Sequence, residues 1–428
     1  MAQAQVEAIV CNIQGLSAKK EDWSSLLLQL DSSVDLLVQN TQLIDNMLIQ
    51  LNPTLHSLGC AFLLHVKVKS GDRNALLDEV FLVQVRNLLL NGDAEQLAVL
   101  RAKVCEVCRE FTESCRNTGQ AMFGIKAMVA AVEKLRPSPE HLTSAHADLL
   151  QLCLLAKNFK PGLAVASQRV VGVCKECVQA RDCVLYFYYG GMLQASLKRF
   201  PQALDMLALA FTMPCHSLNE VVVECYKKYV LVSLIVHGEV APLPKYTLNL
   251  VQRLNKSACA EYSEIAAALA THKVAEVEAS VEKHKEVLKR DSNYGLARQA
   301  AGSVYSRAIL RLTQTFVTLS LEDIATQVAL PDAARVKSEI LSMIDKGQME
   351  ARVDEEKGMV SFETAPDRTA SHHLLAALSA QINVATELNE KLRVVEESIG
   401  ASQAYLAKVC MQDRQRGWGE PGGSAGEW

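Results

Sequence analysis

Hydrophobic and polar positions alternate with a helical period along most of this chain. From residue 3 to about residue 318 one amphipathic helix follows another, and no segment has the two-residue alternation of a strand. Short breaks between helices predict antiparallel pairs, which stack into a solenoid because one pair alone cannot bury its apolar face. The breaks fall at Pro53, Gly59, Gly71, Gly92, Pro137, Pro139, Pro161, Pro201, Pro214, Gly238, Pro242 and Pro244.

Two segments indicate repetition within this helical region. "LAKNFKPGLAVA" (155–166) and "LKRFPQALDML" (197–207) each end a helix with a basic residue and Phe, then restart with Pro near the first helical position. Phe159 and Phe200 are 41 residues apart. The second segment partly fits the tetratricopeptide pattern, although Gln194 replaces the usual aromatic residue and Pro214 comes one residue early. The matching packing positions are Phe187, Gly191, Ala203, Leu207 and Ala210.

Residues 319–362 predict a different arrangement of two helices and a hairpin. Ser320 and Asp323 form a capping box that starts the first helix. The second helix begins after Pro331 and runs to Lys346 and Gly347, a cation followed by the residue that best adopts a left-handed conformation. The apolar period then becomes two, which predicts a winged helix whose outer strand has free backbone groups for another chain. The alternating positions are Met349, Ala351, Val353, Val360 and Phe362, with Gly358 in the turn.

A long helix is expected over about 371–411, and its apolar residues recur at steps of three and four. From Leu388 the spacing is heptad-like, which suits a bundle with helices of other chains, although a helix folded back on its own domain would have the same stripe. The expected contact positions are Leu388, Leu392, Val395 and Ile399. The Gly-rich residues 412–428 are expected to be disordered.

Charge argues against nucleic acid and membrane surfaces as partners. The chain has 49% hydrophobic residues and a net charge of −4, and its winged-helix segment 319–363 carries five basic against ten acidic residues. Residues 282–312 carry seven basic against three acidic residues, which suits a solvated face or an acidic partner. The strongest apolar run, "YVLVSLIV" (229–236), is far shorter than the roughly 20 residues of a membrane span.

Motifs that carry chemistry are absent from the sequence. It has no P-loop, no GxGxxG after a strand and no HExxH, so we expect no catalytic, cofactor-binding or metal site. The N-terminus "MAQAQVEAIV" does not resemble a signal peptide, and the 13 cysteines are expected to stay reduced in the cytoplasm and nucleus.

Two cysteine pairs and one histidine pair are the closest approaches to metal-ligand spacing. Cys105 and Cys108 lie 65 intervening residues before Cys174 and Cys177, and both pairs fall in runs that favour helix, so core thiols are favoured over zinc. His141 and His146 are five apart, which is poor spacing for one helical face, so packing or capping roles are favoured for them.

Helical repeats that lead into a winged helix resemble the PCI domain family of proteasome lid, COP nine signalosome and translation initiation factor three subunits. Several segments are similar to the family of the signalosome's third subunit, and the resemblance covers roughly residues 140–365. The first 135 residues and the tail are similar only in helical character. The segments are "LTSAHADLLQLCLLAKNFKP" (142–161), "YFYYGGM" (186–192), "ECYKKYVLVSLIVHGEVAPLPKYT" (224–247), "RLTQTFVTLSLEDIA" (311–325) and "DEEKGMVSF" (354–362).

The resemblance implies a noncatalytic scaffold in a complex that removes a ubiquitin-like modifier from cullins and so regulates cullin–RING ubiquitin ligases. The isopeptidase would be another, zinc-dependent subunit with an HxH pair, which this chain lacks. Residues 349–362 would contact neighbouring PCI subunits, and the C-terminal helix would join a bundle. A proteasome lid subunit, an initiation factor subunit and an RNA-binding PCI protein remain the alternatives.

These observations predict a mainly α fold with a tetratricopeptide-like solenoid, a PCI domain and a long C-terminal helix. The expected domains are N-terminal repeats over 1–195, a PCI domain over 196–365, a bundle helix over 366–411 and the tail over 412–428. Within the PCI domain, 196–318 would be helical and 319–365 would be the winged helix.

Overall fold

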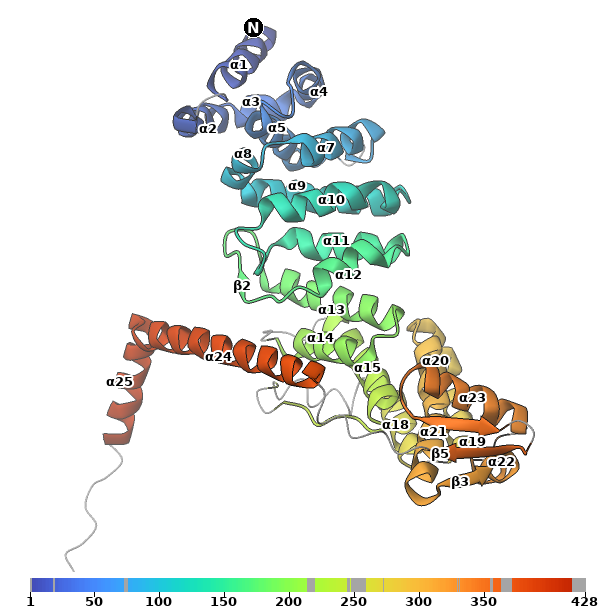
Figure 1. The fold of residues 1–428 in the computed structure, drawn as a ribbon. Coiled ribbons are helices and arrows are strands. Elements are labelled where there is room, and N and C mark those ends of the chain that lie inside the picture. The colour runs from blue at the N-terminus through green and yellow to red at the C-terminus, as the bar shows by residue number, and fades with distance from the viewer. Residues whose placement is uncertain are drawn as a thin grey trace, which may run out of the picture. The chain divides into compact units, whose positions relative to one another are not determined.

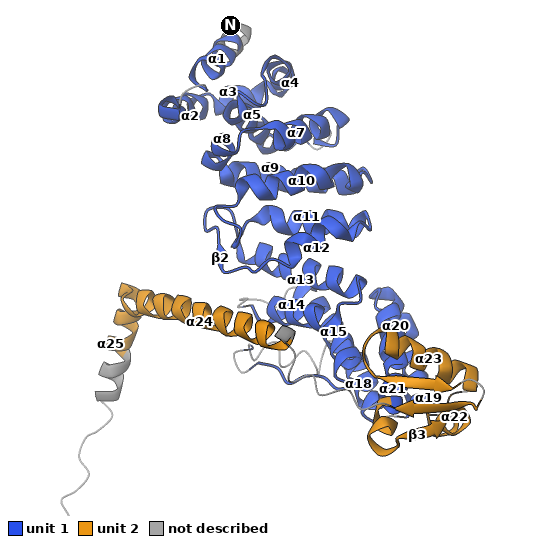
Figure 2. Ribbon diagram, viewed as in Figure 1, with its two compact units in different colours: residues 1–309 blue, residues 310–428 orange. Residues whose placement is uncertain are grey.

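The chain forms two compact units, residues 1–309 and 310–428 (Figure 2). None of the helices in the part that the structure describes is both long enough and apolar enough to cross a membrane. The computed structural model describes residues 2–17, 20–72, 76–213, 220–244, 247, 259–271, 273–328, 330, 332–354, 357–362 and 372–417.

The first unit is a stack of helices, as the periodicity predicts (Figure 1). Its N-terminal part contains α1 (Ala2–Leu16), η1 (Lys20–Asp22), α2 (Trp23–Ser32), α3 (Val34–Gln39), α4 (Thr41–Gln50), α5 (Ser57–Lys69), α7 (Glu79–Asn91), α8 (Ala94–Val99), α9 (Arg101–Asn117) and α10 (Ala121–Leu135). It continues with α11 (Ser144–Leu155), α12 (Phe159–Ala166), α13 (Ala180–Ser196), α14 (Phe200–Thr212), α15 (Glu220–Val236), α18 (Ala260–Ala270), α19 (Val274–Lys283), α20 (Lys285–Arg290) and α21 (Tyr294–Thr315), whose end belongs to the second unit.

The predicted repeat is visible in the backbone of two helix ends. Lys157 and Lys198 both have positive φ, 53° and 59°, and each follows the end of a helix. The next residues close the same turn, since Asn158 N–H donates to the Cys153 carbonyl and Arg199 N–H donates to the Gln194 carbonyl. A left-handed residue followed by this hydrogen bond ends a helix in a defined direction. The turn from α11 to α12 therefore has the same backbone conformation at the helix end as the turn from α13 to α14.

The α13–α14 pair packs as the tetratricopeptide pattern predicts. Ala203, Leu207 and Ala210 are buried. A Cβ added at Gly191 would lie 2.7 Å from Leu207 Cγ, so glycine lets the two helices approach closely. The helix α13 also joins two apolar cores of this unit, because Tyr186 belongs to the N-terminal core and Val184 to the core that extends to α21.

The expectation that residues 3–318 contain no strand is wrong at one place. Strands β1 (His141–Leu142) and β2 (Gly172–Val173) pair in parallel. Each has only two residues, so neither can show the alternation by which a strand is recognised in a sequence.

The second unit contains the predicted winged helix. It consists of β3 (Thr318–Ser320), α22 (Leu321–Val328), α23 (Ala333–Asp345), β4 (Ala351–Asp354) and β5 (Met359–Phe362). Ser320 Oγ accepts a hydrogen bond from Asp323 N–H at 3.0 Å, which confirms the capping residue. Gly347 and Gly358 have φ of 65° and 62°, as their predicted roles after α23 and in the turn require.

The C-terminal region forms two helices, so the prediction of one helix to residue 411 is wrong. Helix α24 (His372–Gly400) is followed by α25 (Gln403–Gly417). Gly400 is a poor residue for continuing a helix, and Ser402 Oγ accepts a hydrogen bond from Tyr405 N–H at 3.4 Å at the new start. The prediction of a disordered tail from residue 412 is also wrong as far as Gly417, and residues 418–428 lie outside the described residues.

Candidate protein–protein interface

The sheet of the winged helix has the order β3–β5–β4, with all pairs antiparallel. The predicted edge position is therefore wrong for Val360 and Phe362, because both lie on the central strand β5 and are buried, at 0% and 8% exposure. The prediction failed because β3 was not foreseen. Met349 precedes β4 and is 9% exposed, while Ala351 and Val353 lie on β4, an edge strand of the sheet described.

Among the residues described, no strand pairs with the backbone groups of Ala351 and Val353 on the outer side of β4. Toward β3, Phe362 N–H donates to the Val317 carbonyl at 2.8 Å, and Leu321 N–H donates to the Gly358 carbonyl at 2.9 Å. The alternation of an antiparallel ladder then directs the backbone of Met359 and Ser361 toward β4. The residues opposite them on β4 are Asp354 and Arg352.

Ala351 and Val353 alternate with Arg352 and Asp354 along β4, so their N–H and C=O groups point away from β5. These backbone groups can pair with the strand of another chain. Ala351 and Val353 thus lie at an edge that no strand covers among the residues described, and the contact of this edge with a partner stays a prediction.

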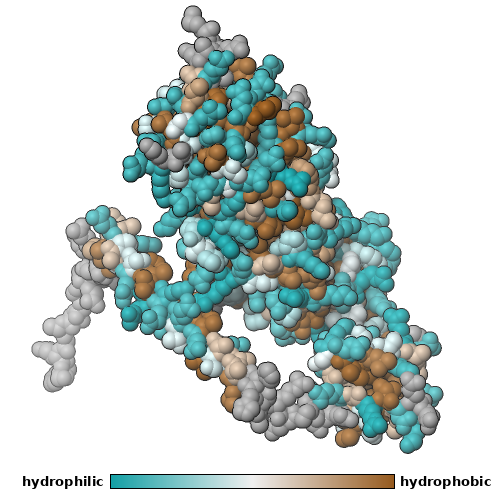
Figure 3. Space-filling model, turned by 45° about the horizontal axis from the view of Figure 1, so that its top comes forward, coloured by the Kyte–Doolittle hydropathy of each residue, from teal (hydrophilic) through white to brown (hydrophobic). Residues whose placement is uncertain are grey.

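The stripe on α24 is exposed along its whole described length. Figure 3 shows apolar side chains at the surface of this segment among polar ones. Such an exposed apolar series on a helix is typical of a surface that another protein covers. The predicted contact residues share one face, and their exposed fractions are 40% for Leu388, 65% for Leu392, 51% for Val395 and 52% for Ile399.

The two cysteine pairs come together, which the sequence did not predict. Cys105 and Cys108 lie on α9, but Cys174 and Cys177 lie in a turn after β2, so the expectation of helix there is wrong. The Cys177 thiol hydrogen-bonds with that of Cys105, and this bond together with burial raises the pKa of Cys177. No group of histidine, cysteine or acidic side chains within the described ranges could hold a metal ion.

The histidine pair separates into two structural roles. His146 is the third residue of α11, and its Nδ1 accepts a hydrogen bond from Thr143 N–H at 3.1 Å in a capping box. Burial lowers the pKa of His146 to about 4, so the ring stays neutral and keeps this bond. The Ser138 hydroxyl lies 2.6 Å from Nδ1 of His141, on β1. The capping interpretation is confirmed for His146.

A buried carboxylate nearby was missed by sequence reasoning. Burial raises the pKa of Asp148 to about 7, and its Oδ2 has no hydrogen-bond partner among the residues described. The Arg109 guanidinium lowers this pKa less than burial raises it, and the carboxylate of Asp182, which accepts a hydrogen bond from Arg109 at 2.7 Å, raises it further. A lone Asp in the run "SAHADLL" gives no signal of this environment in the sequence.

Two family models match the chain. One is described as "COP9 signalosome complex subunit 3, N-terminal helical repeats" and matches residues 20–251. The other is the PCI domain and matches residues 281–364. Together they cover the winged helix and most of the solenoid helices, while α1, α18 and most of α19 fall outside the matched residues.

Two curated relatives are similar over nearly the whole chain. COP9 signalosome complex subunit 3 of Arabidopsis thaliana is 36% identical over 412 residues, covering 96% of this chain and 95% of the relative. COP9 signalosome complex subunit 3 of Drosophila melanogaster is 33% identical over 424 residues, covering 94% of both chains.

Proposed function

Because this chain belongs to the COP9 signalosome subunit 3 family, we propose that it is a noncatalytic scaffold subunit of that complex. In this role it holds other PCI-domain subunits and supports a metalloprotease-containing core. That core would remove a ubiquitin-like modifier from cullins, and the scaffold would act on cullin–RING ligases only through it. The proposed locations are the cytoplasm and the nucleus.

The observation that carries the proposal is the presence of two different candidate binding surfaces in the second unit. One is the free β4 edge at Ala351 and Val353, and the other is the α24 stripe from Leu388 to Ile399. A strand edge bonds laterally through its backbone, whereas a helix stripe binds in a bundle through apolar side chains. Two such surfaces of different kinds suit a subunit that contacts more than one neighbour.

Charge supports protein rather than nucleic acid as the partner of the winged helix. Its 319–363 segment has twice as many acidic as basic residues, and an excess of negative charge repels phosphates. Glu355 and Glu356 of the wing turn lie outside the described residues. Residues 354–358 have three acidic residues against Lys357, whose Nζ lies 3.8 Å from Asp354 Oδ2, so the turn has a net negative charge that disfavours a minor-groove contact.

Native co-purification tests the proposal. The tagged full chain is recovered from its own cells, and its stoichiometric partners are identified by mass spectrometry. We expect several PCI-domain proteins together with one metalloprotease that carries an HxH pair. Recovery with proteasomal ATPases, with initiation factor subunits or alone with RNA would contradict the signalosome role.

The scaffold role is tested separately from membership of the complex. Complex purified from cells that lack this chain, and from cells in which it is restored, is assayed for removal of the modifier from a cullin. We expect loss and recovery of activity together with loss and recovery of the other subunits. Normal activity of a complex that assembles without this chain would contradict the scaffold role.

A further inference from the structure

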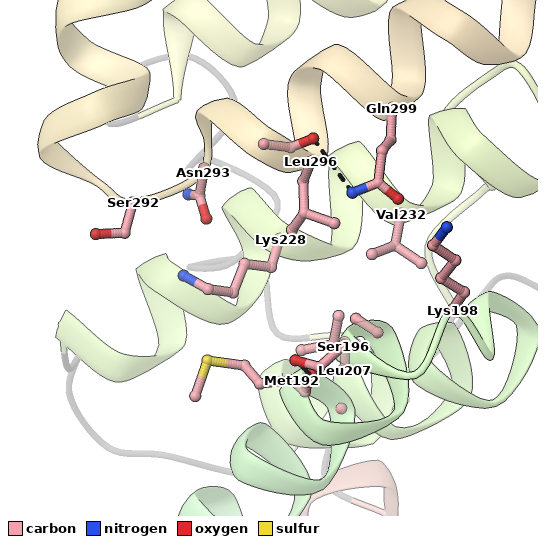
Figure 4. Close-up of a pocket in the computed structure, with 13 residues that line it drawn as sticks. Met192, Ser196, Lys198, Leu207, Lys228, Val232, Ser292, Asn293, Leu296 and Gln299 are labelled. Atoms are coloured by element: carbon pink, nitrogen blue, oxygen red, sulfur yellow. Dashed lines mark hydrogen bonds between the residues drawn. The ribbon is translucent and has the colours of Figure 1, made fainter. Parts of the chain in front are cut away.

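A pocket of about 340 Å³ lies in the first unit (Figure 4). The end of α13, the turn after it, α14, α15 and the start of α21 line it. Its size is within the range of small-ligand sites. Apolar lining comes from Met192, Leu207, Val232 and Leu296, and polar lining includes Lys198, Lys228, Asn293 and Gln299.

Hydrogen bonds hold the rim of the pocket in place. Asp291 accepts hydrogen bonds from Lys227 Nζ at 2.7 Å and from the Tyr262 hydroxyl at 3.0 Å. Although burial acts to raise the pKa of Asp291, these bonds keep it below the ordinary value. Arg307 Nη2 donates to the last-turn carbonyl of Leu234 at 2.6 Å, which ties α21 to α15. The bonds of Asp291 hold the turn before α21 against α15 and α18.

A buried polar atom in this lining has no partner among the residues described. Asn293 is fully buried, and its Nδ2 donates to the Tyr262 hydroxyl at 2.9 Å, which fixes the orientation of the amide. Its Oδ1 accepts no hydrogen bond from any residue described. In Figure 4 this oxygen points toward the side chain of Lys228. A ligand that completes the site must offer Asn293 an N–H donor.

Positive charge surrounds the same space. The 22-residue helix α21 begins here, and its first N–H groups have no acceptor within the helix. Lys198 Nζ has no partner within the described ranges, and Lys228 Nζ donates to Glu224 at 3.1 Å and has two further protons. These groups favour an anion.

We propose that this pocket binds the C-terminal residue of a peptide. Its carboxylate would accept hydrogen bonds from the start of α21 and from Lys228. Its amide N–H, two bonds from the carboxylate carbon, would donate to Asn293 Oδ1. An apolar side chain would pack on Met192, Leu207, Val232 and Leu296. The last residue of a peptide has a carboxylate anion and an amide N–H donor only two bonds apart, which is the combination that sites for peptide C-termini recognise.

Three small probes separate these requirements, and saturation-transfer NMR with the full chain measures their binding. N-acetyl-leucine has both the carboxylate and the N–H, N-acetyl-leucinamide lacks the carboxylate, and 4-methylpentanoate lacks the N–H. We expect each deficient probe to bind about tenfold more weakly than N-acetyl-leucine. Equal binding of all three probes, or binding of none, would overturn the proposal.

A tetrapeptide, acetyl-Ala-Ala-Ala-Leu, tests whether the pocket accepts a chain. Binding at least as tight as that of N-acetyl-leucine is expected. If only the single acylated residue binds, the ligand is a free small molecule and the peptide assignment is wrong.

Two glycines of α21 provide matched variants that locate the binding site. A Cβ added at Gly295 or at Gly302 meets no atom within 4 Å, but only Gly295 lines the pocket. Leucine also favours helix over glycine, so both variants are expected to fold. Gly295→Leu should abolish binding of N-acetyl-leucine and Gly302→Leu should leave it unchanged. Equal effects of the two variants would show that the probe binds elsewhere. This result concerns the first unit alone, so it leaves the scaffold proposal untouched.

Discussion

The exposed stripe of α24 can be tested with two adjacent valines. Val395 lies on the stripe with Leu388, Leu392 and Ile399, whereas Val394 faces roughly 130° away from its centre at about 100° per residue. Their exposed fractions are similar, 51% for Val395 and 62% for Val394. Because residue type, helix and exposure match, Val395→Ser and Val394→Ser differ mainly in the direction they face.

The expected cost follows from the exposed area of each side chain. Full burial of a valine contributes about 1.5–3 kcal/mol, so the half of Val395 that is still exposed leaves about 1 kcal/mol for a partner to provide. Burying the serine hydroxyl without a hydrogen bond adds about 1 kcal/mol, which gives about 2 kcal/mol or roughly 30-fold in Kd. Leu392→Ser, at 65% exposure, should add about as much, so the double variant loses roughly a thousandfold if the costs add.

The assay compares partners recovered with each tagged variant, normalised to the amount of tagged chain. Val395→Ser should reduce recovery, Leu392→Ser with Val395→Ser should abolish it, and Val394→Ser should match wild type. Thermal unfolding of the isolated chains should change little, because both valines are exposed within the chain. Equal losses for Val394→Ser and Val395→Ser, or full recovery of the double variant, would refute the stripe as an interface.

Three further predictions address the β4 edge and two buried groups. Ala351→Pro removes an N–H at the outer edge of β4 and should weaken recovery of the partners. The control Thr318→Pro, at the first residue of the other edge strand, should leave recovery unchanged. Loss of recovery with Thr318→Pro but not with Ala351→Pro would assign the contact to β3. Asp148 has a pKa of about 7 against an ordinary 3.8, so between about pH 4 and pH 7 the folded state holds a proton that the unfolded state has lost, and stability falls as pH rises. Asp148→Asn removes this dependence. Urea unfolding should find the variant more stable than wild type by at most about 4 kcal/mol at pH 8 and equally stable at pH 4. His146 has a pKa of about 4 against an ordinary 6.5, so stability is lost as pH falls from 6.5 toward 4. His146→Gln keeps a residue that can complete the capping box and should remove this loss, which is at most about 3 kcal/mol. If the pH dependence of stability is the same in the variant and the wild type, His146 is not its cause.

Local signals made much of the fold predictable. The capping box at Ser320, the left-handed glycines at 347 and 358 and the repeated helix ends depend on neighbouring residues, so the sequence contains what determines them. The break after Gly400 was also encoded locally, but the apolar stripe continues to Leu406 and concealed it.

Features that depend on distant segments were not predictable. Strand β3 has only three residues, and it is a strand because it pairs with β5. Its partners, Met359 to Ser361, lie at least 39 residues further along the chain. Without β3, Val360 and Phe362 resemble edge residues, whereas pairing on both sides places them in the interior. The meeting of Cys105 with Cys177 has the same origin, since the packing of a turn onto α9 leaves no periodic signal in either segment.

The free edge of β4 also indicates where specificity must come from. Backbone groups at Ala351 and Val353 are the same in any strand, so they provide affinity without distinguishing one partner from another. The side chains must therefore discriminate, and they alternate along β4 between half-buried Ala351 and Val353 and exposed Arg352 and Asp354. Since like charges opposite each other destabilise a strand pair, a matching partner strand should place an acidic residue opposite Arg352. The proposed contact would therefore favour a neighbour with complementary charge over other strands, as an ordered assembly of similar subunits requires.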